Sequence, residues 1–162
     1  MIQESPFGNK GFEVGSTWQS RQALCDSGVH NNVFAGIGKT SGQLGAASVV
    51  LSNKYEDDVD EGEAVWYTGT GGRKDDDGGW GGSGSQAMDQ SFDHQDNAAL
   101  RKSYENRSPI RLIRAIQGSS GVYYRFDGIY DVTKADLVTG RSGYAICRFK
   151  FVRQNDQPPL PQ

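Results

Sequence analysis

Glycine interrupts this sequence too often for a bundle of long helices. The chain contains 22 glycines among 162 residues, and glycine is unfavourable inside helices but suits turns and close approaches of the backbone. Between the glycines lie short runs rich in β-branched and aromatic residues, at 46–51, 64–68, 110–116, 122–132 and 144–152. Such runs are typical of strands. We therefore predict an α+β domain dominated by a strongly bent β-sheet or open β-barrel, with a few flanking helices.

Two segments carry helix signals. The first runs from Thr17, a candidate N-cap, to Ser27, and a glycine follows it. The second starts at Asp96 or Asn97, either of which can cap it, and runs to Glu105. In the first segment Trp18, Arg21 and Leu24 recur every three residues, as on one face of a helix. We predict one short helix in each.

The length of 162 residues suits one domain. We assign residues 1–153 to this domain and 154–162 to a Pro-rich C-terminal tail. No apolar run approaches the roughly 18 residues that a membrane helix needs, and no signal-peptide pattern opens the chain. We therefore expect a soluble intracellular domain without a membrane partner. Cys25 and Cys147 have no CxxC spacing, and we expect both to be buried thiols.

The formal net charge of −3 conceals two segments of opposite sign. Residues 54–98 carry three basic and twelve acidic side chains, whereas residues 101–153 carry eleven basic and four acidic ones. A local basic stripe can bind a polyanion even when the net charge is close to zero. The same distribution also fits two solvated faces that neutralise each other.

Several motifs with catalytic or cofactor-binding meaning are incomplete. Gly38-Lys39-Thr40 is similar to the end of a P-loop, but Val33 stands where its first glycine belongs. GTGGRK has Lys74 in place of the third glycine of a dinucleotide fingerprint, and EDDVDEGE breaks the alternation of a calcium loop. Two cysteines and two histidines do not supply the ligand set of a zinc deaminase. We expect no catalytic residues, no metal and no cofactor.

Two tyrosines flank a group of carboxylates. Tyr55 opens the run YEDDVD, and Tyr67 opens YTGTGGR. Two phenol rings can sandwich a flat heteroaromatic guest, a carboxylate can accept from its exocyclic amine, and the backbone of the glycine-rich turn can contact the remaining edge. Cytosine fits this chemistry, because its N4 amine pairs with Asp or Glu. The same residues also fit two strand tyrosines packed in a core beside a solvated acidic turn.

These residues are part of a longer series of motifs that resembles the SRA family (SET- and RING-associated, also called YDG), whose members bind modified cytosine in DNA. The motifs occur in order along nearly the whole chain: FG at 7–8, VGSTW at 14–18, GVH at 28–30, AGI at 35–37, YEDDVDEGEAVWYTGTGGR at 55–73, DQ at 89–90, FDGIYDV at 126–132, SGY at 142–144 and RFKFVR at 148–153. The resemblance implies a single PUA-like SRA domain. It also implies binding of 5-methylcytosine or 5-hydroxymethylcytosine that is flipped out of duplex DNA.

The resemblance assigns residues to a pocket for the modified base. Tyr55 and Tyr67 match the two stacking rings, and Asp58 matches the carboxylate that accepts from the N4 amine. Thr70 stands where the family lines the space for the 5-methyl group. Further edge contacts are implied for the backbone of Ser52, Asn53, Thr68 and Gly69.

The resemblance also assigns residues to the DNA around that pocket. Phe34 matches the wedge that fills the space left by the flipped base. The loop 74–86 lacks the Asn-Lys-Arg finger with which one animal branch reads the opposite strand, so no preference for hemimethylated CpG is implied. Trp80 and Gln86 are its only candidates for groove contacts. Phosphate contacts are implied for Arg21, His30, Lys54 and Arg73.

The resulting expectation is a non-enzymatic reader, monomeric and nuclear by analogy with eukaryotic relatives, with duplex DNA and histone or chromatin proteins as partners. Three alternatives stay open. The chain can be the specificity module of a modification-dependent nuclease or chromatin enzyme, or a PUA-like module for RNA or protein. It can also be a hydrolase that holds a metal with Asp57, Asp58 and Asp60.

Overall fold

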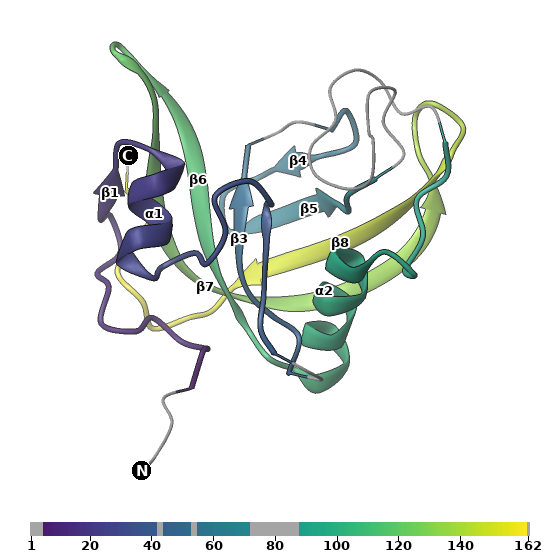
Figure 1. The fold of residues 1–162 in the computed structure, drawn as a ribbon, viewed down its shortest axis with the longest axis horizontal. Coiled ribbons are helices and arrows are strands. Elements are labelled where there is room, and N and C mark those ends of the chain that lie inside the picture. Colours follow the sequence, from purple (N-terminus) through teal and green to yellow (C-terminus); the bar gives the residue numbers. More distant parts are fainter. Residues whose placement is uncertain (1–4, 42–43, 53–54, 72–87, 162) are drawn as a thin grey trace.

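The computed structural model describes residues 5–41, 44–52, 55–71 and 88–161. These residues form two helices, α1 (Arg21–Ser27) and α2 (Gln95–Asn106). Their strands are β1 (Thr17–Trp18), β2 (Ile37–Lys39), β3 (Ala46–Leu51), β4 (Val59–Asp60), β5 (Ala64–Thr68), β6 (Ile110–Gly118), β7 (Gly121–Thr139) and β8 (Ala145–Arg153). Figure 1 shows a strongly curved sheet with α1 beside the β6–β7 pair and α2 on the other side of these strands. The predicted α+β architecture with a bent, open sheet is confirmed.

The strand order explains the curvature of the sheet. The strands follow the order β2-β3-β6-β7-β8-β5-β4, and β1 pairs with β7. β3 and β6 are parallel, whereas the other paired strands are antiparallel. The 19-residue β7 pairs with β6 along its first half and with β8 along its second. Register shifts at Arg111/Ile113 and Val132/Lys134 mark irregularities, and such bulges bend a sheet.

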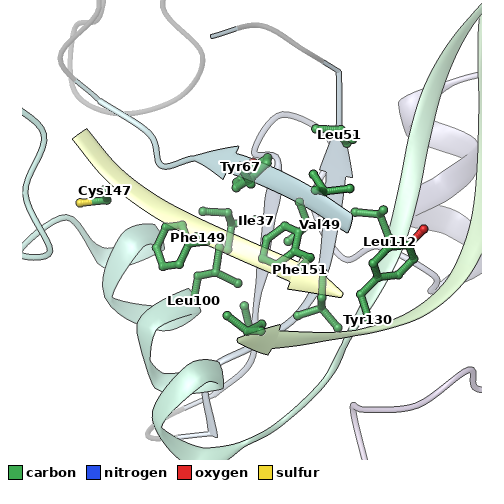
Figure 2. Packing of buried hydrophobic residues seen from close by; sticks show 14 residues of the cluster. Ile37, Val49, Leu51, Tyr67, Leu100, Leu112, Tyr130, Cys147, Phe149 and Phe151 are labelled. Atoms are coloured by element: carbon green, nitrogen blue, oxygen red, sulfur yellow. The ribbon is translucent and has the colours of Figure 1, made fainter. Parts of the chain in front are cut away.

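The main core fills the concave side of this sheet. All six residues of β3 are buried, because β3 lies between β2 and β6 and has no solvated face. Figure 2 shows side chains of β3, β5, β8 and α2 converging in one cluster, with Tyr67 at one side of it. Phe149 and Phe151 of β8 project into the same cluster. This core fixes the strands from which the pocket residues project.

The predicted start of the first helix at Thr17 is wrong. Thr17 belongs to β1 and pairs with Arg125 of β7, because the free edge of β7 supplies backbone hydrogen bonds at this point. The helix begins after Ser20, whose Oγ accepts from Ala23 N at 3.0 Å, as an N-cap serine does. Gly28 ends the helix with a φ of 86°, a conformation that favours glycine.

The second helix starts slightly earlier than its sequence signals predict. His94 is the N-cap, and its Nδ1 accepts from Asp96 N at 3.2 Å. The predicted capping residues Asp96 and Asn97 lie within the first turn instead, and both are buried. Their side chains face the sheet, so they serve tertiary contacts rather than the cap.

The five strand runs exist, and β6 and β7 are longer than their sequence patterns predict. β7 continues to Thr139, where it still pairs with Ala145 of β8. Of the two cysteines, Cys147 is buried as expected, whereas Cys25 on α1 is only partly buried. Within the described residues, no helix is long and apolar enough to cross a membrane.

The FDGIYDV segment builds the centre of the sheet. Its Asp127 carboxylate accepts from Arg114 at 2.7 Å and from Arg125 at 2.5 Å. Arg114 also pairs with Asp60 at 2.7 Å and donates to Tyr130 Oη at 3.2 Å. This network joins β4, β6 and β7, and it satisfies the charges that the sheet buries.

The Pro-rich segment after Arg153 packs onto the domain. Arg153 donates from Nε to Asp127 O at 3.0 Å and from a terminal nitrogen to Pro158 O at 2.5 Å. The Gln157 amide bonds both backbone groups of Ile129, at 2.8 and 2.9 Å. These contacts hold the segment beside β7.

Candidate nucleic-acid interface

A pocket opens between the ends of β2, β3 and β5. Its cavity volume is about 40 Å³, and it is partly open to solvent. Seven of the predicted site residues meet there, although they come from distant parts of the chain: Arg21, Phe34, Ser52, Tyr55, Asp58, Tyr67 and Thr70. Five residues without a predicted role complete the wall: Ala35, Gly36, Ile37, Val50 and Asp96.

Tyr67 forms a fixed wall of this pocket. Its ring packs against Phe151 with 5.4 Å between the ring centroids, and its side of β5 faces the core. Burial raises the pKa of the Tyr67 phenol well above its usual range, so the ring stays neutral at physiological pH. Gly36 allows the ring to take this position, because a Cβ at residue 36 would lie 2.8 Å from Tyr67 Oη.

Asp58 connects the two tyrosine segments. Its Oδ1 accepts from Thr68 N at 2.8 Å, and its Oδ2 accepts from Tyr55 N at 3.4 Å. Burial raises the pKa of this carboxyl to about 6, although both backbone hydrogen bonds oppose the shift. The group is therefore mainly ionised at pH 7 and presents a hydrogen-bond acceptor to the pocket.

The turn after Tyr67 is clamped by two amide side chains. Gln90 donates to Gly69 O at 2.9 Å and to Gly71 O at 3.1 Å, and it accepts from Cys147 N at 2.9 Å. Asn97 bonds Thr70 N at 2.8 Å and Thr70 O at 3.0 Å. The turn is consequently held in one shape before any guest enters.

The edge contacts of Thr68 and Gly69 stay predictions, and part of their backbone is already paired in this structure. Gly69 N donates to Cys147 O at 2.7 Å and Gly69 O accepts from Gln90, while Thr68 N donates to Asp58. Both residues are buried behind the pocket wall, because β5 places them against β8. Of the predicted edge residues that the structure describes, Ser52 lines the pocket, whereas Thr68 and Gly69 lie next to lining residues.

Phe34 stands at the mouth of the pocket with 69% of its surface exposed. The loop that carries it is well held, since Asn32 Oδ1 accepts from Phe34 N at 2.8 Å and from Ala35 N at 2.7 Å. Arg21 donates to Asn32 O at 3.1 Å and to Ala35 O at 2.7 Å. An exposed apolar side chain on a rigid loop suits insertion into a base stack.

His30 does not lie where a phosphate could contact it. Its side chain is fully buried, and its two ring nitrogens lie 2.7 Å from Ser48 Oγ and 2.8 Å from Ala35 O. Burial lowers its pKa to about 4, so the ring is neutral at pH 7. The predicted phosphate contact is replaced by a structural one, in which His30 joins the Phe34 loop to β3.

The basic segment 101–153 is not a single exposed stripe. Arg111, Arg114 and Arg153 are buried and bonded within the fold. Other cations gather on the outer side of the sheet around Trp66, with Arg148 at 4.3 Å and Lys150 at 5.1 Å from the indole centroid. Much of the positive charge therefore serves the architecture.

Two carboxylates of the acidic cluster have partners within the fold. Arg141 N donates to Asp57 Oδ1 at 3.0 Å, and Asp60 pairs with Arg114. Among the residues that the structure describes, no group of His, Cys, Asp or Glu has the arrangement of a metal site. The predicted positions Asn53, Lys54, Arg73, Trp80 and Gln86 lie outside the described residues.

Comparison with known proteins agrees with this architecture. The family model described as SAD/SRA domain matches residues 6–157. The chain belongs to the SAD/SRA family.

Relatives of this SRA domain include a UHRF1-like protein of Cryptococcus neoformans var. grubii, 41% identical over 168 residues that cover 94% of this chain and 47% of that protein. ORTHRUS 2, an E3 ubiquitin-protein ligase of Arabidopsis thaliana, is 36% identical and is matched over 96% of this chain and 25% of its own length. The chain thus spans less than half of either relative.

Two solved structures share the fold. KRYPTONITE in complex with mCHG DNA and SAH has a TM-score of 0.84 and 32% identity, covering 94% of this chain and 34% of the other. The SUVH5 SRA domain bound to fully hydroxymethylated CG DNA has a TM-score of 0.80 and 33% identity, covering 96% and 99%. The curved sheet of this SRA domain is therefore the form that both proteins adopt.

Two residues that support the pocket of this SRA domain, Gln90 and Asn97, are not among the site residues that the sequence predicts. Gln90 belongs to a family motif but had no assigned role, and Asn97 was interpreted as a helix cap. Polar side chains that a fold buries must find partners, and a glycine-rich turn has backbone groups that can bond to them. Amide side chains together with a glycine-rich turn were the sequence signal for such contacts. Which side chain meets the turn is decided by the packing of α2 beside it.

Proposed function

We propose that this SRA domain binds 5-methylcytosine or 5-hydroxymethylcytosine that is flipped out of duplex DNA into the pocket between Tyr55 and Tyr67. The observation that carries the proposal is the Asp58 carboxylate, which the backbone of Thr68 and Tyr55 fixes at the pocket wall. A cytosine offers this carboxylate the N4 amine, whereas thymine offers a carbonyl oxygen that it repels.

The energetics of base flipping are consistent with this arrangement. Extrusion of a base costs a few kcal/mol of stacking and pairing. Stacking on an aromatic side chain returns about 1–3 kcal/mol per ring, so two tyrosines offset much of that cost. Phe34 supports the flipped state from outside, because an apolar wedge replaces the lost base in the stack.

The proposed role is recognition rather than catalysis. Asp57 and Asp60, the carboxylates that a hydrolase would need beside Asp58, are engaged by Arg141 and Arg114. The relatives named above are eukaryotic proteins, which supports a nuclear location for a monomeric reader of chromatin DNA.

A second candidate is a specificity module within a larger protein. The chain spans 47% and 25% of the two relatives, and one solved structure that it matches, at 33% identity, is the modification-dependent TagI restriction endonuclease. In that case the same pocket selects the DNA and another domain acts on it.

A binding titration at fixed, near-physiological salt tests the function. The wild-type domain and Asp58→Asn are each titrated with duplexes of one sequence that carry cytosine, 5-methylcytosine, 5-hydroxymethylcytosine or thymine at one position. We expect at least tenfold tighter binding of a modified duplex by the wild type. The variant should lose most of its discrimination against a thymine at the same position, because an amide can donate to O4.

The control is Asp136→Asn, which removes an exposed carboxylate from β7. It should retain the wild-type ranking. Equal, salt-dominated affinity of the wild type for modified and unmodified duplexes would refute the proposal, since phosphate contacts alone carry no such preference.

A further inference from the structure

Asp96 is a buried carboxylate on the pocket wall that the recognition scheme above does not use. Its side chain is 1% exposed, and Lys39 Nζ lies 3.0 Å from its Oδ1. No described residue donates a hydrogen bond to Oδ2. A buried acceptor without a donor is costly, so this oxygen is a place where a guest group would be stabilised.

The neighbours of Asp96 indicate which edge of a flipped base it would face. Asn97, the next residue in α2, holds both backbone groups of Thr70, and Asp96 and Thr70 line the same pocket. Thr70 is the residue expected beside the substituent on C5 of the flipped cytosine. On this reasoning Asp96 is expected on the C5 side of a flipped base, whereas Asp58 is expected at its N4 amine.

Lys39 neutralises Asp96 without occupying the pocket. Its ammonium also lies 3.3 Å from Gln95 Oε1, its side chain is 32% exposed, and it is absent from the pocket wall. The ion pair accounts for the charge of the buried carboxylate but leaves Oδ2 without a donor.

We propose that Asp96 forms a subsite for a hydrogen-bond donor on C5, so that the domain prefers 5-hydroxymethylcytosine over 5-methylcytosine and rejects 5-carboxylcytosine. This inference rests on the proposed function. A hydroxyl donates to a carboxylate in a strong, charge-assisted bond, a methyl group leaves the oxygen unpaired, and a carboxylate on the guest is repelled.

Titration of the wild-type domain tests the subsite without any substitution. Duplexes that differ only at C5 carry hydrogen, methyl, hydroxymethyl or carboxyl at one cytosine. A net gain of one charge-assisted bond corresponds to about tenfold tighter binding of the hydroxymethyl than of the methyl duplex. The carboxyl duplex should bind no better than the unmodified one.

Two variants separate the effect of Asp96 as a hydrogen-bond acceptor from the effect of its charge. Asp96→Leu removes the acceptor and should reduce the advantage of the hydroxymethyl duplex over the methyl duplex to about twofold or less. Asp96→Asn removes the charge and should raise affinity for the carboxyl duplex about tenfold. Asp93→Asn, an exposed carboxylate on the same segment, is the matched control and should leave all four affinities unchanged.

The outcomes separate the inference from the function. A wild-type domain that prefers modified duplexes but binds methyl as tightly as hydroxymethyl overturns the subsite and leaves the reader intact. The subsite is also refuted if Asp96→Leu is folded by circular dichroism and keeps the hydroxymethyl advantage. A domain without preference for any modified duplex refutes both.

Discussion

Gly36 lies directly behind the hydroxyl group of Tyr67: a Cβ at residue 36 would approach Tyr67 Oη to 2.8 Å and Val50 O to 3.3 Å. The glycine on the loop before β2 thus determines how far the tyrosine ring can withdraw from the pocket. The two residues belong to different walls, and their close approach ties the Phe34 loop to the stacking surface.

Gly36→Ala should therefore weaken binding of a modified duplex by displacing the Tyr67 ring. We expect about five- to twentyfold lower affinity and a loss of about 1–3 kcal/mol in the free energy of unfolding, because an extra methyl in a packed site forces shifts. Fluorescence anisotropy and urea denaturation measure the two effects.

The double variant Gly36→Ala/Tyr67→Phe is the control for this contact. Removal of Oη makes room for the new methyl group, so the double variant should be more stable than Gly36→Ala alone. If the two substitutions are simply additive, the proposed contact does not cause the defect.

Asp58→Asn should become more stable relative to the wild type as pH rises. Burial raises the pKa of folded Asp58 from 3.8 to about 6, so the folded state binds a proton more tightly than the unfolded state. The protonated Asp58 carboxyl therefore stabilises the wild type below about pH 4, and this stabilisation is lost as pH rises through 6. From pH 4 to pH 7.5 the stability difference between variant and wild type should shift by about 2 kcal/mol in favour of the variant.

Thermal or urea unfolding of both proteins at several pH values gives this difference. A pH-independent difference would show that Asp58 titrates normally. The variant should at the same time bind modified DNA poorly, so that the site gains recognition at the expense of stability.

His30 should make the folded state less stable in acid, which is the opposite of the pH dependence caused by Asp58, and His30→Gln should remove this effect. Burial lowers the pKa of folded His30 from 6.5 to about 4, so the unfolded state takes up the proton first. Its contribution is present above pH 6.5 and is lost as pH falls toward 4. The variant should be less stable by about 1–3 kcal/mol at pH 7.5, because it disturbs the bonds to Ser48 and Ala35.

The difference in the free energy of unfolding between the two proteins should shift by about 3 kcal/mol in favour of the variant between pH 7.5 and pH 4. Urea denaturation at both pH values checks it, and His94→Gln, at the partly exposed N-cap of α2, is the comparison. A constant difference would mean that His30 has the same pKa in the folded and unfolded states.

Phe34→Ala should weaken duplex binding through loss of the wedge. The reduction should be about five- to twentyfold on a fully paired modified duplex. It should be smaller when the modified base is mispaired, because extrusion then costs less. Competition titrations with the two duplexes measure the ratio, and Leu137→Ala, an exposed apolar residue on β7, serves as control. An equal loss on both duplexes would argue against a role in base extrusion.

The local chemistry of the pocket was readable from the sequence. Tyr55, Asp58 and Tyr67 stand in a spacing that already suggested a sandwich around an aromatic guest, and the glycines and β-branched runs indicated a curved sheet. These features depend on side-chain type and on the two-residue period of a strand, which puts Tyr67 inside and Trp66 outside.

The tertiary structure decided what surrounds those three residues. His30 looked like a phosphate ligand but is buried against Ser48, and Asp96 looked like a helix cap but lies on the pocket wall. Strand order and sheet curvature bring α2 beside the turn after β5, which no local pattern encodes. Burial then changes the chemistry, because desolvation shifts the pKa of His30 and Asp58 in opposite directions and leaves Asp96 Oδ2 without a donor.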